Sequence, residues 1–597
     1  MMLLSDYVIN FLVKKGIKDI FFVSGGGIMH LLDSMHRNKK INYISNYHEQ
    51  ASAIAAEGYA RIKNKPGVCL VTTGPGSTNA VTGVAGAWVE SIPVLYISGQ
   101  VKRETIANYK KHRQLGMQEI NIIDIVKKIT KYSKEIINPN KIAYELEKAF
   151  FETTNGRPGP VWISIPVDVQ AMMIDEKKLK HFVYPKEDKS KKQKLDNDIK
   201  DLISMLKKSE KPVLISGYGI RLSGAIKQFK QLVDKLNIPV LYNINGVDIL
   251  SEDHPLKMGL AGPFGHRRAN FVLQNADLII SIGSSLGLEI TGYNFDGFAP
   301  KAKKISVNID AGELNKPNIK IDLPIVADAK EFIKIFLSKI KKEKFVFSNK
   351  WQEACLSWKK RYPTMIKDYF NNKYNVNSYV FMDILSDLLN SEDVLTTGIG
   401  LDAVSFYTAF KTKDNQRAFV NKHFGGMGWC LPLAIGSCIG NNKKRTVCVT
   451  GDGSIQFNIQ ELNTINYYRL PIKIFVFNNK GYKSIRDTQT NLFEGRLVGA
   501  DHTSGVINPN FKKLSTAYNL KFNYIKNNDE LKIKIKQVLK EKGPVLCEVN
   551  IAFDQIRMPK TITYQGKDGK LYSKPLEDMW PLLSRKELYK NMHMFNE

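Results

Sequence analysis

The sequence predicts an α/β fold with parallel sheets, distributed over several domains. In segment 446–482, TVCVTGDGSIQFNIQELNTINYYRLPIKIFVFNNKGY, an apolar run, a helical pattern and a second apolar run follow one another. A right-handed crossover sets two such strands parallel in one sheet. Segment 68–79 repeats the transition, because a buried-type strand enters Gly74-Pro75-Gly76 and opens a helix. The length of 597 residues exceeds one hydrophobic core and indicates three or four domains.

The first domain is expected over residues 1–172. The N-terminal sequence MMLLSDYVINFLVKKG has no basic leader or cleavage site, so it predicts an amphipathic helix and no signal peptide. Two short strands follow, one ending in Ser24-Gly25-Gly26-Gly27 and one running into Glu49 and the small-residue helix ASAIAAEGYAR. The Lys-rich stretch KEDKSKKQKLDND, residues 186–198, predicts a solvated linker.

The middle domain is expected over residues 195–345, and its first strand is the apolar run in KPVLISG. A charged connector, KIKKEKF, leads to the third domain over 351–552, which contains segment 446–482. Residues 553–597, with DGKLYSKPLEDMWPLL, are expected to form a tail that closes over the functional site.

Two polar side chains follow the two strands of segment 446–482. Asp452 lies in Gly451-Asp452-Gly453 and Asn479 in Asn478-Asn479, at the strand ends where open α/β sheets bind ligands. A carboxylate and an amide oxygen suit a hard cation such as Mg²⁺, which keeps positions for water and phosphate oxygens. A lone Gly-Asp-Gly is more often a turn, and the paired asparagines favour a metal site that holds a diphosphate.

Gly-Asp-Gly followed by Asn-Asn resembles the metal–diphosphate motif of thiamine diphosphate (ThDP) enzymes. Residues 43–51, YISNYHEQA, resemble the family segment whose glutamate activates the cofactor. The resemblance implies that Asp452, Asn479 and the Gly481 carbonyl bind the metal. It implies that Glu49 hydrogen-bonds N1′ of the aminopyrimidine, so that the 4′-amino group can remove the C2 proton. Without the resemblance, Glu49 would be a first-turn helix acid.

The resemblance also assigns the rest of the cofactor pocket. Gly26 lies in a glycine turn that faces the thiazolium, and Met427 props ThDP in its bent shape, although methionine is more often core filler. Gly26 and Gln118 are implied as further catalytic residues beside Glu49. The other implied cofactor-binding residues are Gly25, Pro75, Asn79, Gly426, Gly451, Gly453, Ser454 and Tyr482.

The middle domain resembles acetolactate synthase large subunits in segments such as HPLKMGLAGPFGHRRAN and TGYNFDGFAPKAKKISVNIDAGEL. That branch decarboxylates pyruvate on ThDP and transfers the two-carbon unit to a carbonyl acceptor. The resemblance implies three doubly wound α/β domains, which are pyrimidine-binding, central and Rossmann-like, and diphosphate-binding. It also implies a homodimer or homotetramer with active sites between chains.

Four departures from that branch surround the expected acceptor channel. Thr488 replaces a tryptophan, Met117 a phenylalanine and Val167 a lysine, and in segment 482–486 only Ile485 keeps an apolar contact. The substrate pocket is therefore assigned to Met117, Ile485 and Thr488. Since the ThDP residues are intact, we expect unchanged donor chemistry with a 2-keto acid or a keto-sugar nucleotide as acceptor. The alternatives are a simple 2-keto acid decarboxylase or carbon–carbon lyase, and a non-catalytic paralogue that binds ThDP or nucleotide.

FAD as a second cofactor is left open. The arginine pair that holds FAD in acetolactate synthases is missing from residues 283–289, GSSLGLE. Arg157, Gly217, Gly219 and His266 still match the flavin-site pattern. A dehydrogenase is disfavoured because no full GxGxxG fingerprint is present.

Composition excludes other classes. The formal net charge is +29, but the lysines are dispersed and no recognition module accompanies them, so no nucleic-acid partner is expected. The sequence contains no long apolar run, so no membrane span is predicted. Six scattered cysteines without CxxC indicate buried thiols in a reducing, cytoplasmic compartment.

Overall fold

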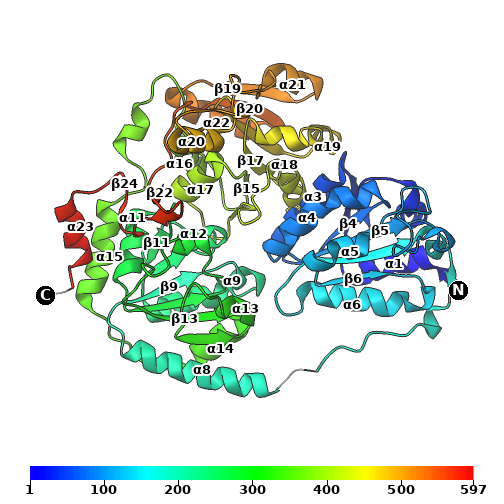
Figure 1. Cartoon of the computed structure of the whole chain (residues 1–597), viewed down its shortest axis with the longest axis horizontal. Coiled ribbons are helices and arrows are strands. Elements are labelled where there is room, and N and C mark those ends of the chain that lie inside the picture. Colours follow the sequence, from blue (N-terminus) through cyan, green and yellow to red (C-terminus); the bar gives the residue numbers. More distant parts are fainter. Residues whose placement is uncertain (187–188, 596–597) are drawn as a thin grey trace.

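A computed structural model describes residues 1–186 and 189–595, which form three α/β domains (Figure 1). Each domain contains a six-stranded parallel sheet with helices packed on it. The α/β class predicted from sequence is confirmed.

The N-terminal domain has the strand order β3-β2-β4-β5-β7-β6. Its strands are β2 (Asp19–Phe22), β3 (Asn42–Ser45), β4 (Gly67–Val71), β5 (Val94–Gln100), β6 (Tyr132–Glu135) and β7 (Val161–Pro166). Its helices are α1 (Leu4–Lys14), α2 (Met29–Arg37), α3 (Glu49–Lys63), α4 (Pro75–Val89), α5 (Ile122–Val126), α6 (Ile142–Thr154) and α7 (Val167–Gln170). The short strands β1 (Met2–Leu3) and β8 (Met173–Ile174) pair and tie the chain start to the domain end.

The C-terminal domain has the order β16-β15-β17-β18-β20-β19, which repeats the N-terminal arrangement strand for strand. Its strands are β15 (Val394–Thr397), β16 (Arg417–Phe419), β17 (Thr446–Gly451), β18 (Ile472–Asn478), β19 (Lys521–Ile525) and β20 (Val545–Asn550). Its helices are α16 (Ser378–Leu388), α17 (Leu401–Ala409), α18 (Cys430–Gly440), α19 (Glu461–Tyr467), α20 (Lys483–Leu492), α21 (Phe511–Ala517) and α22 (Leu531–Lys540). The two outer domains therefore share one fold.

The middle domain has the order β11-β10-β9-β12-β13-β14, the arrangement of a doubly wound dinucleotide-binding sheet. Its strands are β9 (Pro212–Ser216), β10 (Val240–Tyr242), β11 (Lys257–Leu260), β12 (Leu278–Ile282), β13 (Lys303–Asn308) and β14 (Leu323–Val326). Its helices are α8 (Lys189–Lys207), α9 (Gly219–Leu222), α10 (Ile226–Leu236), α11 (Arg267–Asn275), α12 (Leu288–Thr291), α13 (Ala311–Leu314) and α14 (Ala329–Lys339). The crevice at the switch point lies between β9 and β12.

One segment expected as a linker is helical, and one segment expected in the third domain packs on the middle domain. The expected linker 186–198 is helical from Lys189, because Leu195, Ile199 and Leu202 form an apolar stripe in the middle-domain core. Residues 187–188 of that linker lie outside the described residues. After the second connector, α15 (Asn349–Arg361) buries Trp351 and Trp358 in the middle-domain core. The predicted domain boundaries remain predictions.

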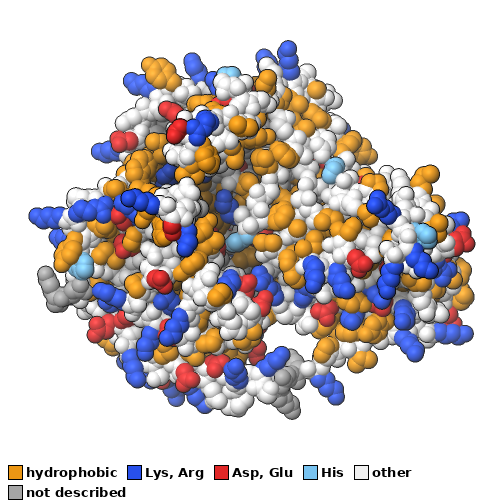
Figure 2. Space-filling model, in the orientation of Figure 1, with side chains coloured by type: hydrophobic (Ala, Val, Ile, Leu, Met, Phe, Trp, Pro, Cys, Tyr) orange, Lys and Arg blue, Asp and Glu red, His pale blue; other side chains and the backbone are white. Residues whose placement is uncertain are grey.

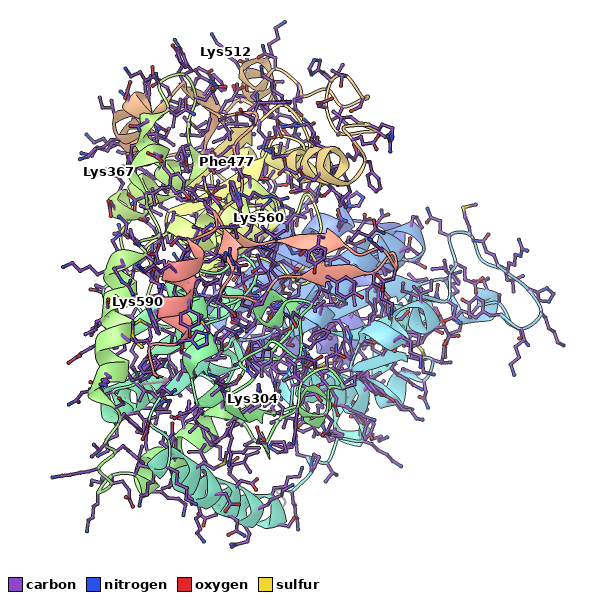
Figure 3. The ribbon with its side chains drawn as sticks, turned by 60° about the vertical axis from the view of Figure 1, so that its left-hand side comes forward. Lys304, Lys367, Phe477, Lys512, Lys560 and Lys590 are labelled. Atoms are coloured by element: carbon purple, nitrogen blue, oxygen red, sulfur yellow. The ribbon has the colours of Figure 1, made fainter. Side chains whose placement is uncertain are left out.

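The tail packs mainly on the middle domain. It contains β21 (Lys560–Thr561), β22 (Thr563–Gln565), β23 (Leu571–Ser573), β24 (Met579–Trp580) and α23 (Arg585–Met592). Leu576 is buried in the middle-domain core, and the Arg267 guanidinium donates a hydrogen bond to the Met579 carbonyl at 3.3 Å. Strands β22 and β23 pair antiparallel as a hairpin. Figure 3 shows this hairpin reaching out from the tail, with Lys560 at its base.

Helix α3 crosses α18 closely and joins the outer domains (Figure 1). A Cβ on Gly436 would lie 1.8 Å from the Ala55 carbonyl oxygen, so only glycine permits this approach. Beside the crossing, Arg61 pairs with Glu57 and Glu90, and all three side chains are buried. Trp429 and Asn421 of the C-terminal domain donate to Glu57, and Asn245 of the middle domain donates to Glu90.

Among the described residues, no helix is both long and apolar enough to cross a membrane. Lys and Arg side chains are spread over all parts of the face that Figure 2 shows. The six cysteines are free and buried.

Candidate active site

Strand pairing brings the two predicted metal residues together. β17 and β18 are parallel neighbours, with Gly451 opposite Phe477, so Asp452 and Asn479 leave adjacent strand ends. The Asp452 amide donates to the Phe477 carbonyl at 3.1 Å and fixes this junction. The structure therefore assembles the site edge that the sequence predicts.

Asp452 is buried and receives several hydrogen bonds. Its Oδ1 accepts from Gly453 N–H at 2.8 Å, and its Oδ2 accepts from Gly481 N–H at 3.0 Å and from Asn508 Nδ2 at 2.6 Å. Burial raises the pKa of the Asp452 carboxyl to about 6 despite these hydrogen bonds. A nearby cation would offset this desolvation and favour the charged carboxylate.

Two amide oxygens beside this carboxylate are free to act as ligands. Asn479 Oδ1 and Asn508 Oδ1 are buried, and neither has a hydrogen-bond partner among the described residues. A buried polar atom normally has a partner. The described ranges contain no cluster of three His, Cys, Asp or Glu side chains suited to a metal. The Asp452 carboxylate and these two amide oxygens are hard oxygen donors. This donor set fits Mg²⁺.

Glycines shape the loop that follows Asn479. Gly481 has φ +128° and sits against Ala500, whose carbonyl oxygen would lie 2.4 Å from an added Cβ. A Cβ on Gly453 would lie 2.2 Å from the Tyr482 ring. A side chain at Gly453 would push the Asp452 and Asn479 loops apart, and one at Gly481 would displace residues 500–501.

The predicted Met427 segment lies against the same loops. Gly428 N–H donates to Ser454 Oγ at 3.0 Å, and Asn458 Nδ2 donates to the Gly428 carbonyl at 2.9 Å. Met427 itself is half-buried. The structure thus brings residues Gly426–Gly428, Gly451 and Ser454 to one end of the C-terminal sheet.

Glu49 begins α3, at the carboxyl end of β3. His48 Nδ1 caps the helix by accepting from Gln50 N–H at 3.1 Å. The Glu49 carboxylate is half-buried, and its Oε2 accepts from Asn79 Nδ2 at 3.0 Å. Pro75 is the first residue of α4, which presents Asn79 to Glu49. Two residues predicted from sequence to bind one cofactor are therefore in direct contact.

The Glu49 segment is tied to the C-terminal domain of the same chain. Gln50 Oε1 accepts from Asn458 at 3.1 Å, and Glu461 accepts from Asn46 at 2.8 Å and from the Tyr47 amide at 2.9 Å. The carboxylate of Glu461 was not singled out from sequence, although it follows the metal motif on α19.

The glycine turn 25–27 is tight on one side and open on the other. A Cβ on Gly25 would lie 2.5 Å from the Thr72 side chain, whereas a Cβ on Gly26 would meet no atom within 4 Å. The chain itself does not need glycine at position 26. Open space there fits the expectation that Gly26 leaves room for a ligand.

The predicted substrate residues lie on two separate elements. Gln118 has φ +62°, and its carbonyl oxygen packs closely against Gly74. The neighbouring Met117 is 87% exposed. Glu119 holds this loop by accepting from the amides of Leu115 and Gly116 at 2.7 and 3.0 Å. Ile485 and Thr488 share the exposed face of α20. The assignment of these residues to one substrate pocket remains a prediction.

A cavity of about 670 Å³ lies at the switch point of the middle sheet, facing the N-terminal domain. Arg157 and Gly219 line it, and Gly217 packs against Gly283 at its edge. Ser285 and Glu289 line the part where the family arginines are missing.

His266 does not line that cavity. Its Nδ1 lies 3.3 Å from the Leu260 amide and its Nε2 lies 3.1 Å from the Tyr407 carbonyl. Burial lowers the pKa of His266 to about 3, so the ring is neutral. It packs between the middle and C-terminal domains.

Known protein families match this chain in the order of its domains. The thiamine pyrophosphate enzyme N-terminal TPP binding domain matches residues 2–125, the central domain 199–336 and the C-terminal TPP binding domain 398–549. Thiamine pyrophosphate and thiamine diphosphate are the same molecule. The chain belongs to the thiamine pyrophosphate enzymes, so the ThDP prediction is confirmed.

Curated relatives place it in a particular branch. A probable acetolactate synthase large subunit from Methanocaldococcus jannaschii is 33% identical, with 92% of this chain and 91% of the relative covered. The acetolactate synthase large subunit of Lactococcus lactis subsp. lactis is 31% identical, with 93% of each covered. The chloroplastic acetolactate synthase 2 of Nicotiana tabacum is 29% identical, with 93% of this chain and 83% of the relative covered. The predicted resemblance to the acetolactate synthase-like branch is confirmed.

Proposed function

We propose that the protein is a carboligase that decarboxylates pyruvate or a similar 2-keto acid and transfers the two-carbon unit to a carbonyl acceptor. The observation that carries the proposal is the similarity to acetolactate synthase large subunits over more than nine-tenths of both chains. The ThDP residues are retained, whereas the acceptor-channel residues differ. The acceptor is a 2-keto acid or a keto-sugar nucleotide.

Mg²⁺ would be held by Asp452, Asn479 and the Gly481 carbonyl. The buried Asn479 Oδ1, which has no hydrogen-bond partner within the described part of the chain, and the desolvated Asp452 carboxylate support this assignment. Asn508 adds a further amide to the same place. ThDP, when bound, supplies the carbanion chemistry.

The chain's own groups orient the reaction. Glu49 would hold a proton at N1′, and Asn79 would fix the Glu49 carboxylate through the 3.0 Å hydrogen bond. Met427 would provide an apolar support, and Gly26 would leave space for substrate. Gln118 would reach the site from the N-terminal loop.

The middle-domain cavity is the proposed FAD site. Its place at the switch point of a doubly wound sheet supports this assignment. Asn243 Oδ1 and Asn245 Oδ1 are buried in its lining and lack partners among the described residues, so they could accept hydrogen bonds. Purified protein should show flavin absorbance, and a colourless protein that takes up no added FAD would contradict the assignment.

The proposed assembly is a homodimer or homotetramer with active sites between chains, in the cytoplasm. Exposed aromatic side chains near the Glu49 and metal segments support association: Tyr47, Phe457 and Tyr467 are 59%, 51% and 78% exposed. Six free, buried cysteines fit a reducing compartment. Sedimentation of an active monomer would contradict the assembly.

The function is tested by incubating the enzyme with ThDP, Mg²⁺, ¹³C-labelled pyruvate and carbonyl acceptors. Mass spectrometry should find the labelled two-carbon unit in an acceptor adduct, with one CO₂ released per adduct. Free aldehyde as the sole product, with acceptor present, would favour the simple decarboxylase. Absence of CO₂ from every simple 2-keto acid would favour the non-catalytic paralogue.

A further inference from the structure

A group of cations gathers beside helix α20, where the tail begins. Lys483 pairs with Asp487 one turn along the helix, and Arg557 Nε lies 3.4 Å from the other oxygen of that carboxylate. Arg557 Nη1 also donates to Ser484 Oγ at 3.4 Å. Lys560 lies three residues beyond Arg557, at the start of β21 (Figure 3).

Positive charge exceeds negative charge in this group. Asp487 is the carboxylate that pairs with both Lys483 and Arg557. Burial, and then the positive charges of Arg557 and Lys483, lower the pKa of the Lys560 ammonium, and Asp487 only partly opposes them. Arg557 Nε is buried and has no hydrogen-bond partner among the described residues, since its 3.4 Å approach to Asp487 lacks hydrogen-bond geometry. The group therefore has capacity for a further anion.

The group borders the expected acceptor channel. Helix α20 starts directly after Gly481 and Tyr482 of the metal loop. Ser484 and Thr488 lie one turn apart on this helix, and the Ser484 hydroxyl contacts Arg557. Arg557 also faces Phe264 of the middle domain at 5.9 Å. Figure 2 shows Lys or Arg side chains inside the hollow where the domains meet.

We propose that Lys483, Arg557 and Lys560 bind a phosphoryl group on the carbonyl acceptor. This inference rests on the proposed carboligase function and names the acceptor class. The planar guanidinium presents parallel N–H donors that match phosphate oxygens. Three cations with one carboxylate leave two positive charges, which match a phosphate dianion better than a single carboxylate.

The direct test compares phosphorylated acceptors with their unphosphorylated counterparts. Dihydroxyacetone phosphate is compared with dihydroxyacetone, and a nucleoside diphosphate keto sugar and a keto sugar 1-phosphate are compared with the free keto sugar. The phosphorylated member of at least one pair should give the higher kcat/KM by about tenfold or more. The pair with the larger ratio identifies a monophosphate or a nucleotide as the source of the phosphoryl group. Equal kcat/KM within every pair would overturn the proposal.

Variants test the residues. Arg557→Met and Lys560→Met should each lower the kcat/KM ratio of phosphorylated over unphosphorylated acceptor by about 10- to 100-fold. Lys570→Met, on the exposed hairpin of the same tail, is the matched control and should leave the ratio unchanged. An equal loss of kcat/KM for both acceptors would show that the cations only hold the tail in place. A raised ThDP requirement with an unchanged ratio would place them at the cofactor diphosphate. Either result would overturn the proposal.

A measurement on the unmodified enzyme tests the site even if the variants fail to fold. Inorganic phosphate should inhibit adduct formation competitively against the phosphorylated acceptor. Inhibition that is competitive only against ThDP, or no inhibition, would contradict the site. If no 2-keto acid releases CO₂, the carboligase function fails. If CO₂ is released and no phosphoryl preference appears, only this inference fails.

Discussion

At the scale of single residues, Asn479 is the side chain whose surroundings argue most directly for a metal ligand. Its Oδ1 is buried and unpaired among the described residues, beside a carboxylate whose pKa burial raises to about 6. A native protein rarely leaves such an oxygen without a partner. A metal ion would satisfy both groups at once.

Asn479→Ala should therefore raise the Mg²⁺ concentration that gives half-maximal CO₂ release by about tenfold or more, because an oxygen ligand is lost. The measurement is a Mg²⁺ titration of chelator-treated enzyme. Asn491→Ala, on the exposed end of α20, is the matched control. An unchanged Mg²⁺ dependence of Asn479→Ala would contradict the metal assignment.

His266 illustrates a residue whose sequence pattern and structural position differ. The pattern matched a flavin contact, whereas the ring is buried against Tyr242 and the Tyr407 carbonyl. Charged groups facing it are Arg268, Glu252 and Lys257, and burial is the main cause of its low pKa. A neutral ring that packs two domains together makes stability depend on pH.

The pKa of His266 falls from 6.5 unfolded to about 3 folded, so the unfolded chain binds the proton more readily. Stability is therefore full above pH 6.5 and is lost as pH falls toward 3, by about 2 kcal/mol between pH 6.5 and 5. His266→Gln should flatten the fall of the thermal midpoint over that range. His112→Gln, on an exposed loop, should retain the fall. An equally steep fall in His266→Gln would contradict this account.

At the scale of elements, the sequence predicted that Asp452 and Asn479 lie at one sheet edge, because strand pairing decides this position. Two parallel neighbours must bring Asp452 and Asn479 to one edge. Asn508 was missed because it comes from an irregular loop, which no periodicity places. Helix α8 was missed because its first turn is Lys-rich and its apolar positions begin only at Leu195.

The α3–α18 crossing gives a prediction at this scale. Gly436→Ala should lower stability by about 2–3 kcal/mol, since its Cβ would lie 1.8 Å from the Ala55 carbonyl oxygen. This is opposite to the gain that alanine normally gives within a helix. The thermal midpoint should drop by about 5 °C or more. Gly543→Ala, where no atom lies within 4 Å of the added Cβ, should leave it nearly unchanged.

A stable Gly436→Ala protein would mean that the two helices can separate without cost. The crossing would then not determine how the outer domains are held, and the arrangement of Glu49 relative to the C-terminal sheet would need another explanation.

At the scale of the whole molecule, two domains of one fold are joined by a buried charge cluster. Glu90 accepts from His423 and pairs with Arg61. Burial raises the pKa of the Glu90 carboxyl, but the charges of His423 and Arg61 outweigh burial and lower this pKa to about 2. Because Asn245 also reaches Glu90, all three domains meet at one carboxylate. The sequence indicated the domain number and class, but this cluster joins residues hundreds of positions apart and has no local pattern.

Glu49 lies on one outer domain and Asp452 on the other, and in the proposed assembly Glu49 of one chain and Asp452 of a second chain would hold the two ends of one cofactor. The most direct measurement is CO₂ release from pyruvate by Glu49→Gln, at saturating ThDP and Mg²⁺, with ThDP binding followed separately. Loss of the carboxylate should slow release by about 10²- to 10⁴-fold, the usual contribution of a positioned proton-transfer group, while ThDP still binds. A Glu49→Gln enzyme that releases CO₂ at the unmodified rate would contradict the account.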